Sequence, residues 1–251
     1  MTAAFPILLV VVATTAAQSG GVHVSREKVS AALTTGGVLI EVPHVRVAGA
    51  RVDKPTTLGT QTGTTILYVT DGEATFSVGE RRQRLAKGDL IVVPAGTTRA
   101  FESVLPAISY YLVTVPVLAA GAKAEIVYVN HDGVAAAMKK AGPLADGPNL
   151  RVSGGYRTGP YAPEAYSPAV EVHTNEADLF YVIEGSATQV LGGTVNGGKE
   201  TAPGQIRGST IDGGQTYRLG KGDVMWVPAG MPHWFPEIPE PLSYLLVKVF
   251  Y

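Results

Sequence analysis

An internal duplication is the feature of this 251-residue chain that most restricts its possible folds. The segment VHVSREKVSAAL at 22–33 matches VYVNHDGVAAAM at 127–138, and RLAKGDLIVVPAG at 84–96 matches RLGKGDVMWVPAG at 218–230. The matching segments keep the same order in both copies, and two insertions lengthen the second copy. Each half is therefore expected to form the same unit, so the fold must be one that can be built twice in tandem.

Each copy is a series of short runs rich in β-branched residues, separated by glycine and proline. The chain contains 30 glycines and 17 prolines, which favours many turns between short strands over long helices. One short helix is expected after the first strand of each copy, where Ser25 and Asn130 are suitable N-cap residues. These patterns predict a mainly β protein made of two tandem double-stranded β-barrels, or jelly rolls, with short helices.

The charge and the cysteine content exclude several classes of function. The 20 Lys and Arg residues nearly balance the 21 Asp and Glu residues, so no basic field is available to hold nucleic acid. The chain has no cysteine, which excludes disulfides, thiolate metal sites and cysteine nucleophiles, so any metal ion must be held by nitrogen and oxygen. We expect a small-molecule ligand and no nucleic-acid or membrane partner in the processed protein, and the sequence leaves a homodimer open.

The N-terminal segment resembles a signal peptide. Its apolar run at 5–13 is too short to span a bilayer, and Thr15 and Ala17 then fit the small-x-small pattern of a cleavage site. Cleavage after Ala17 would make the protein secreted or periplasmic. A buried first strand at 7–12 is the alternative, because this run is rich in β-branched residues. The expected division of the chain is a signal peptide at 1–21, a first barrel at 22–120 and a second barrel at 121–251.

Two motifs in the second copy resemble those of the cupin superfamily. The second motif reads G-x5-P-x-G-x2-H at 222–233, and the first reads E-x-H-x4-D-x6-G at 171–185. In cupins the first motif reads His-x-His, three or four residues, Glu, six residues, Gly, so here Glu replaces the first His and Asp replaces the Glu. The resemblance extends over about residues 22–249, and with the duplication it is a resemblance to bicupins.

The cupin resemblance implies conical β-barrels that commonly hold Mn, Fe, Ni, Cu or Zn at the barrel mouth. Carried onto this sequence, it implies one divalent ion (Mn, Fe, Zn, Ni or Cu(II)) held by Glu171, His173, Asp178 and His233. The residue types agree, because two imidazoles and two carboxylates suit a borderline divalent ion. Glu176 is an alternative to Asp178, but three residues after His173 in an extended strand it is expected to face outward.

The first copy lacks this ligand set. Its counterpart positions fall at Leu58 or Gly59, Thr60 or Gln61, Thr65 and Arg99, and none of them is a histidine or a carboxylate. The first barrel is therefore expected to be free of metal. Arg99 stands where His233 stands in the second copy, and it is either an anion-binding group in the barrel mouth or a solvated charge on the rim.

The two insertions of the second copy flank the expected metal site. They cover residues 154–168, which contain three tyrosines, and residues 192–214, which are rich in glycine. Both are expected to be loop-like. They are either lids or binding loops whose tyrosines stack on a sugar or an aromatic ring, or segments that pack the two barrels together.

The candidate functions belong to two classes. The first is a metal-dependent enzyme, either an oxidoreductase of dioxygenase type or an isomerase or lyase, acting on a small polar or neutral substrate with Glu171 as the catalytic carboxylate that moves a proton. Neutral substrates are expected because the two carboxylate ligands would neutralise a divalent ion. The second class is a secreted, non-catalytic module that binds a sugar or sequesters metal, as the ligand-free first copy suggests.

Overall fold

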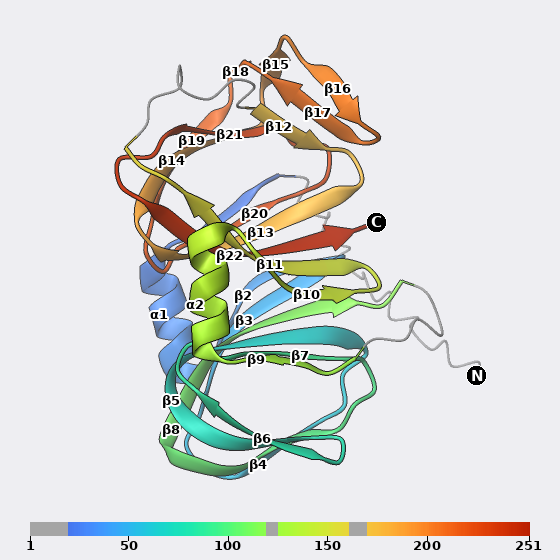
Figure 1. The fold of residues 1–251 in the computed structure, drawn as a ribbon, viewed down its shortest axis with the longest axis vertical. Coiled ribbons are helices and arrows are strands. Elements are labelled where there is room, and N and C mark those ends of the chain that lie inside the picture. Colours follow the sequence, from blue (N-terminus) through green and yellow to red (C-terminus); the bar gives the residue numbers. More distant parts are fainter. Residues whose placement is uncertain (1–19, 119–124, 161–169) are drawn as a thin grey trace, which may run out of the picture.

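The computed structural model of the protein describes residues 20–118, 125–160 and 170–251 (Figure 1). Nearly all of the expected signal peptide, and residues 161–168 of the first insertion, lie outside the described residues. The prediction of a mainly β protein with short helices is confirmed. Neither of the two helices in these ranges is long and apolar enough to cross a membrane.

The first half of the chain, in the lower part of Figure 1, contributes seven strands to an eight-stranded sheet, and β9 (Val127–Val129) of the second half is the eighth. The order is β2-β3-β8-β5-β7-β9, with β4 paired to β8 and β6 paired to β5. Its elements, up to the last long strand, are β1 (Val22–Val24), α1 (Arg26–Thr35), β2 (Gly37–Val42), β3 (Val45–Val52), β4 (Thr56–Gly59), β5 (Gly63–Val78), β6 (Arg81–Ala86), β7 (Leu90–Val93) and β8 (Arg99–Pro116). The long strands β5 and β8 bend through both layers of this barrel (Figure 1).

The second half, in the upper part of Figure 1, forms two six-stranded sheets in the orders β1-β20-β13-β22-β11-β10 and β16-β17-β12-β21-β14-β19, with a separate β15–β18 hairpin. Its elements are β9 (Val127–Val129), α2 (His131–Lys140), β10 (Pro143–Gly147), β11 (Leu150–Arg157), β12 (Val170–His173), β13 (Glu176–Glu184), β14 (Ser186–Leu191), β15 (Thr194–Asn196), β16 (Lys199–Ala202), β17 (Gln205–Gly208), β18 (Thr210–Asp212), β19 (Gln215–Gly220), β20 (Val224–Val227), β21 (His233–Glu237) and β22 (Leu242–Phe250).

The two halves exchange their first strands. Strand β1 pairs with β20 of the second half, with Val22 opposite Trp226. In the same way β9 pairs with β7 of the first half, with Val129 opposite Leu90. Two sheets therefore contain strands from both sides of the expected boundary at residues 120–121. They are the eight-stranded sheet, which includes β9, and the six-stranded sheet that includes β1.

The helices that follow the exchanged strands return to their own halves. Helix α1 packs on β3 and helix α2 packs on β11. A Cβ atom built on Gly49 of β3 would lie 2.6 Å from the backbone of Ala32, and one on Gly154 of β11 would lie 2.5 Å from the backbone of Ala137. Glycine therefore permits the close approach of helix and strand at equivalent places in both copies.

An aspartate from the opposite half holds the start of each helix. Asp223 Oδ1 accepts a hydrogen bond from the Arg26 backbone N–H at 2.6 Å, and Asp89 Oδ1 accepts one from the His131 backbone N–H at 2.8 Å. Ser25 is the N-cap residue of α1, as predicted, but its side chain makes no capping hydrogen bond. The carboxylate from the other half supplies an acceptor at this helix start instead.

The expected cap on the second helix is confirmed. The Asn130 side chain accepts a hydrogen bond from the Gly133 backbone N–H at 3.0 Å, as a local N-cap residue should. Asn130 and Asp89 together satisfy two of the exposed donors in the first turn of α2. The start of α2 thus combines a cap that local sequence can predict with a contact that depends on the strand exchange.

Replacing Asp89 with alanine is expected to lower the free energy of unfolding by about 3 kcal/mol. Asp89 is only 3% exposed and accepts hydrogen bonds from the backbone of Ala86 and His131 and from the Tyr128 hydroxyl. Its removal leaves these donors without their acceptor at the contact between the halves. Urea unfolding measures the change, and Asp53→Ala, at an exposed position, is the control, with an expected change within about 0.5 kcal/mol. A loss below about 1 kcal/mol for Asp89→Ala would contradict this role.

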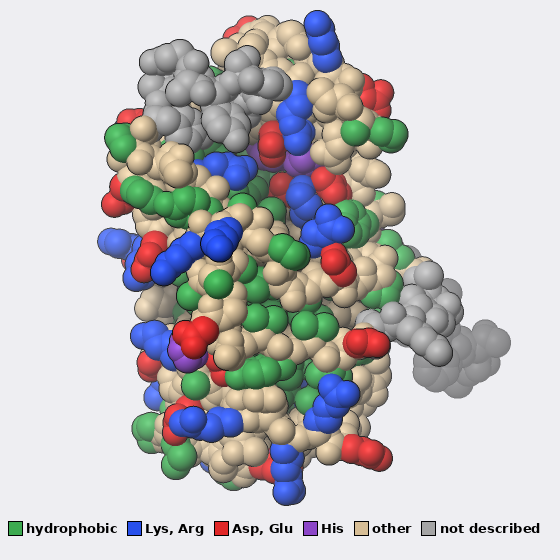
Figure 2. All heavy atoms as spheres, in the orientation of Figure 1, with side chains coloured by type: hydrophobic (Ala, Val, Ile, Leu, Met, Phe, Trp, Pro, Cys, Tyr) green, Lys and Arg blue, Asp and Glu red, His purple; other side chains and the backbone are tan. Residues whose placement is uncertain are grey.

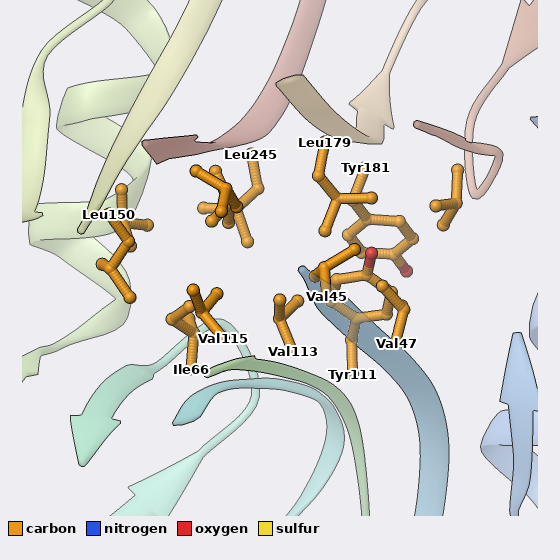
Figure 3. Close-up of a cluster of buried hydrophobic side chains, with 14 of the residues drawn as sticks. Val45, Val47, Ile66, Tyr111, Val113, Val115, Leu150, Leu179, Tyr181 and Leu245 are labelled. Carbon is orange, nitrogen blue, oxygen red and sulfur yellow. The ribbon is translucent and has the colours of Figure 1, made fainter. Parts of the chain in front are cut away.

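The largest hydrophobic core lies between the two halves rather than inside either barrel. Residues of both halves contribute to it, and Figure 3 shows Tyr111 of β8 and Tyr181 of β13 lying against each other, with Val45 beside them. The two tyrosine rings stack with centroids 4.7 Å apart. Smaller cores, which include Phe101 in the first barrel and Phe235 in the second, fill the barrel interiors. The two barrels are therefore joined by a continuous packed interface.

Candidate metal centre

The structure brings together the four residues that the motifs single out as ligands. Glu171 and His173 lie two residues apart on β12 and so share one face, Asp178 lies on β13, and His233 begins β21. Glu171 is the register partner of His233, which places the two motifs side by side. Figure 2 shows histidine and acidic side chains gathered with basic ones in the upper part of the molecule.

The distances between the donor atoms leave room for an ion among them. His173 Nε2 lies 3.7 Å from Glu171 Oε2 and 3.5 Å from Asp178 Oδ2, and His233 Nε2 lies 3.6 Å from each of these oxygens. Such gaps are too long for good hydrogen bonds, but two ligands on a tetrahedral ion with bonds of about 2.1 Å lie about 3.4 Å apart. One donor atom each from Glu171, His173 and His233 falls within 4.8 Å of the others, and Asp178 joins the group through both imidazoles.

The histidines are oriented as metal ligands. Their side chains are 5% and 3% exposed, and neither Nε2 atom has a hydrogen-bond partner among the described residues. The other ring nitrogens are engaged: His173 Nδ1 lies 2.6 Å from Gln205 Oε1, and His233 Nδ1 lies 3.2 Å from the Met231 carbonyl. With Nδ1–H donating to these oxygens, the lone pairs on Nε2 face the cluster. The donor set therefore fits one divalent ion, which would satisfy both buried nitrogens.

The pKa shifts of His173 and Glu171 show that the site favours a positive charge. Burial lowers the pKa of His173, but Asp178 and Glu171 outweigh burial and raise that pKa to about 9 when no ion is bound. A divalent ion would therefore displace a proton from Nε2. Burial raises the pKa of Glu171, but the imidazoles of His173 and His233 outweigh burial and hold that pKa below its ordinary value. The two carboxylates are thus kept ionised, and they attract positive charge to the position between the imidazoles.

Glu176 lies beside the site rather than facing away from it. Its Oε1 atom is 3.2 Å from His173 Nδ1, and it accepts hydrogen bonds from Gln205 at 3.0 Å and from Lys248 at 2.9 Å. The expectation of an outward side chain is wrong because residues 174–175 bend between β12 and β13. Glu176 begins the new strand and shares a face with Asp178, so it supports the ligands from behind.

The second insertion is a set of strands, so the loop-like expectation for residues 192–214 is wrong. It contains β15 to β18, and β17 pairs with β12 so that Gln205 lies opposite His173 and Arg207 opposite Glu171. Arg207 Nη2 is 3.4 Å from Glu171 Oε1. Pairing with β12 satisfies the backbone groups at that edge of the sheet, which favours a strand over a loop. In the first insertion, residues 154–157 belong to β11.

A cavity of about 230 Å³ is lined by three of the four residues, namely Glu171, His173 and Asp178. Three cationic side chains line it, namely Arg157, Arg207 and Lys248. Its aromatic lining consists of Phe180, Phe235 and Tyr244. The motifs did not predict these cations. The sequence does contain one signal, because Lys248 interrupts the apolar run LLVKVF of the last strand. Lys248 Nζ donates to Glu176 at 2.9 Å and to Asp178 at 2.8 Å, so it neutralises part of the acidic charge around the site.

The sheet register in the first half identifies the counterparts of the ligands. Gly59 of β4 pairs with Arg99 of β8, as Glu171 pairs with His233 in the second half. The alternatives left open by spacing are therefore decided in favour of Gly59 and, two residues later, Gln61. None of these first-half positions carries an imidazole or a carboxylate.

Comparison with known proteins places both halves in one family. A family model described as "Cupin domain" matches residues 53–112, and a model described as "Cupin" matches residues 156–247. Comparison with curated protein sequences found no match. The two family models fall on the two barrels, in tandem and in the same order as the internal repeat.

Several solved structures have the same fold. Salicylate 1,2-dioxygenase from Pseudaminobacter salicylatoxidans has a TM-score of 0.63 at 12% identity, covering 91% of this chain and 84% of that chain. A putative glyoxylate-induced protein from Pseudomonas aeruginosa has a TM-score of 0.54 at 14% identity, covering 85% and 79%. Oxalate decarboxylase from Bacillus subtilis has a TM-score of 0.52 at 12% identity, covering 92% and 74%. The chain therefore belongs to the cupin superfamily, as a bicupin with two cupin domains in tandem.

Proposed function

We propose that this bicupin is a metal-dependent enzyme that acts on a small carboxylate, with a reaction of dioxygenase type as the favoured class. The observation that carries the proposal is the group of donor atoms at 3.5–3.7 Å, with two buried and unpartnered imidazole nitrogens, beside a cavity lined by three cations. Two proteins of the same fold are named for carboxylate substrates, salicylate and oxalate, and one of them is studied for its Mn(II) centres.

The proposed substrate class differs from the neutral molecule expected from the ligands alone. That expectation counted only the two carboxylates nearest the ion. The cavity wall also contains Glu176, and the three acidic side chains are matched by the three cations Arg157, Arg207 and Lys248. The charge of a bound divalent ion then remains uncompensated by the protein, which favours an anionic substrate over a neutral analogue.

The residues of the cavity have distinct roles in this proposal. A bound divalent ion would supply Lewis acidity at the base of the cavity. Arg157 and Arg207 bind and orient the substrate carboxylate, since guanidinium groups match its planar geometry. Glu171, whose side chain is 33% exposed and therefore accessible from the cavity, holds or moves a proton at Oε2. Phe180 and Phe235 exclude water from the aromatic wall.

Gln205 holds one imidazole in the required tautomer. Its Oε1 atom accepts from His173 Nδ1, while its amide nitrogen donates to Glu176. This hydrogen bond leaves the lone pair of His173 Nε2 available to the ion. Residues that contact metal ligands commonly fix the tautomer of a ligating histidine in this way. In the described part of the first half, no strand corresponds to β17, which carries Gln205, in keeping with a single metal site.

Salicylate and phenol differ by one carboxylate and provide a direct test of the substrate class. The metal-loaded protein is expected to bind salicylate at least about ten-fold more tightly than phenol, because one charge-assisted pair contributes about that much. Arg207→Gln should remove most of this preference and leave the metal content unchanged. Titration calorimetry measures both affinities. Equal affinity for the two compounds would contradict an anionic substrate.

Turnover separates an enzyme from the alternative of a binding module. Oxygen consumption and product formation with a panel of small carboxylates should reveal a reaction that depends on the loaded ion. Tight carboxylate binding without turnover by any member of the panel would favour the non-catalytic module. The observation that supports this alternative is the first barrel, which lacks the metal-ligating residues.

We also propose that the protein is exported. The supporting observation is the short apolar run at 5–13 followed by small residues, which is typical of a signal peptide. The mass of the protein purified from its native source should correspond to a chain that begins at Gln18. An intact Met1 in a cytoplasmic fraction would contradict export.

A further inference from the structure

The first barrel contains a buried guanidinium group without an acidic partner. Arg99 is 5% exposed, and its Nη1 atom donates to Thr65 Oγ1 at 2.7 Å. Its Nε atom is buried and has no acceptor among the described residues, none of whose carboxylates pairs with this side chain. A buried charge in a folded protein is ordinarily paired, because leaving it unpaired is costly.

Arg99 occupies the place in the first barrel that the metal ligands occupy in the second. It is the counterpart of His233, and Thr65 is the counterpart of Asp178, so the Arg99–Thr65 contact replaces the contact between those two ligands. Along β8, Arg99 and Phe101 share the face that points into the barrel core. Arg99 is therefore not the solvated rim charge that was one of the two interpretations of the sequence.

Aromatic side chains belong to the same barrel core, which the inward face of β8 enters. Phe101 packs against Tyr110, with ring centroids 5.4 Å apart, and against Phe76 at 4.9 Å. Burial lowers the pKa of Arg99, with the nearby Tyr110 acting in the opposite direction. A guanidinium keeps its proton even so, and the positive charge therefore persists inside the barrel.

The free edge of the guanidinium defines the chemistry of a partner. Nη1 is engaged with Thr65, whereas Nε and Nη2 form no hydrogen bond with any described residue. These two nitrogens lie on one edge of the planar group, where their N–H bonds are parallel and match the two oxygens of a carboxylate. The small exposed fraction of Arg99 favours a small anion, of the size of formate or acetate.

We propose that the first barrel is a second binding site, which holds a small carboxylate anion on the Nε and Nη2 edge of Arg99. The site is separate from the metal centre and does not depend on the function proposed for it. The chain has thus kept both barrel interiors as binding sites, one for a cation and one for an anion.

A titration of the metal-free protein with acetate tests this site. In the 15N NMR spectrum, the buried Nε–H of Arg99 is expected to shift in a saturable manner as acetate replaces chloride at constant ionic strength. Arg99→Lys identifies the resonance by removing it. Acetate should also raise the thermal unfolding midpoint, and Arg99→Leu should weaken that acetate dependence about 10- to 100-fold, the effect of losing one charge-assisted pair.

Arg207→Gln is the matched control, because it removes an arginine from the cavity of the other barrel. It should keep the acetate-dependent shift of the Arg99 resonance. A resonance that does not move in the wild-type protein, or an acetate effect that Arg99→Leu retains, would overturn the proposal. The metal content of Arg99→Leu should equal that of the wild type, so failure here leaves the metal centre unaffected.

Discussion

His233→Ala is expected to reduce the bound metal from about one divalent ion per chain to almost none. His233 Nε2 is one of the two buried nitrogens of the donor group. Replacing a residue that only hydrogen-bonds to a metal ligand lowers metal affinity by about 10- to 100-fold. Replacing a ligand itself should therefore lower metal affinity by more than about 100-fold. Elemental analysis after reconstitution and dialysis measures the content, and a titration with a competing chelator measures the affinity.

Arg99→Ala provides the control, because it alters the equivalent position of the first barrel. This variant should retain one ion per chain. Equal loss of metal in both variants would mean that the ion is not held by the second barrel. Two ions per chain, or none in the wild type after reconstitution with excess metal, would contradict a single site built from Glu171, His173, Asp178 and His233.

Glu171→His is expected to keep the metal ion while lowering kcat by about 100-fold or more, because a general base contributes about 10²- to 10⁴-fold. The substitution restores the first histidine of the cupin motif, so a ligand remains at that position. It removes a negative charge at the cavity, which should strengthen the binding of small carboxylates relative to neutral analogues. Steady-state kinetics, metal analysis and the ratio of salicylate to phenol affinity measure the three effects.

Glu237→Gln is the control for this substitution, since it changes an exposed carboxylate on β21, the strand that carries His233. It should leave metal content, kcat and the affinity ratio unchanged. If Glu171→His retains full kcat, Glu171 does not move the proton. If the affinity ratio also stays constant, Glu171 does not act on the ion, and the metal site consists of His173, Asp178 and His233 with open positions for substrate or O₂.

Local sequence patterns were sufficient to predict the architecture and the position of the site. The repeat of RLAKGDLIVVPAG as RLGKGDVMWVPAG indicates the same turn and strand in both halves, and the structure has both. The spacing of Glu171 and His173 places them on one face of a strand, because side chains alternate along a strand whatever its neighbours are. The missing donors of the first copy are likewise a matter of residue type alone.

Local patterns failed where an unforeseen bend or a strand distant in the chain decided the outcome. Glu176 turns toward His173 because the chain bends at 174–175, which resets the alternation that the sequence had suggested. Gln205 reaches His173 only because β17 pairs with β12. β17 lies in the glycine-rich insertion at 192–214. Glycine-rich strands have weak register preferences, so the sequence does not reveal which strand they pair with.

The sequence by itself determined that the chain forms two barrels, and that the second alone carries nitrogen and oxygen donors at the spacing of a metal site. Only the tertiary structure decided that the barrels exchange their first strands, that Arg157, Arg207 and Lys248 surround the site, and that Arg99 is buried. The physical reason is that alternation along a strand is a property of neighbouring residues, whereas charge balance and burial depend on side chains that come together through long-range pairing.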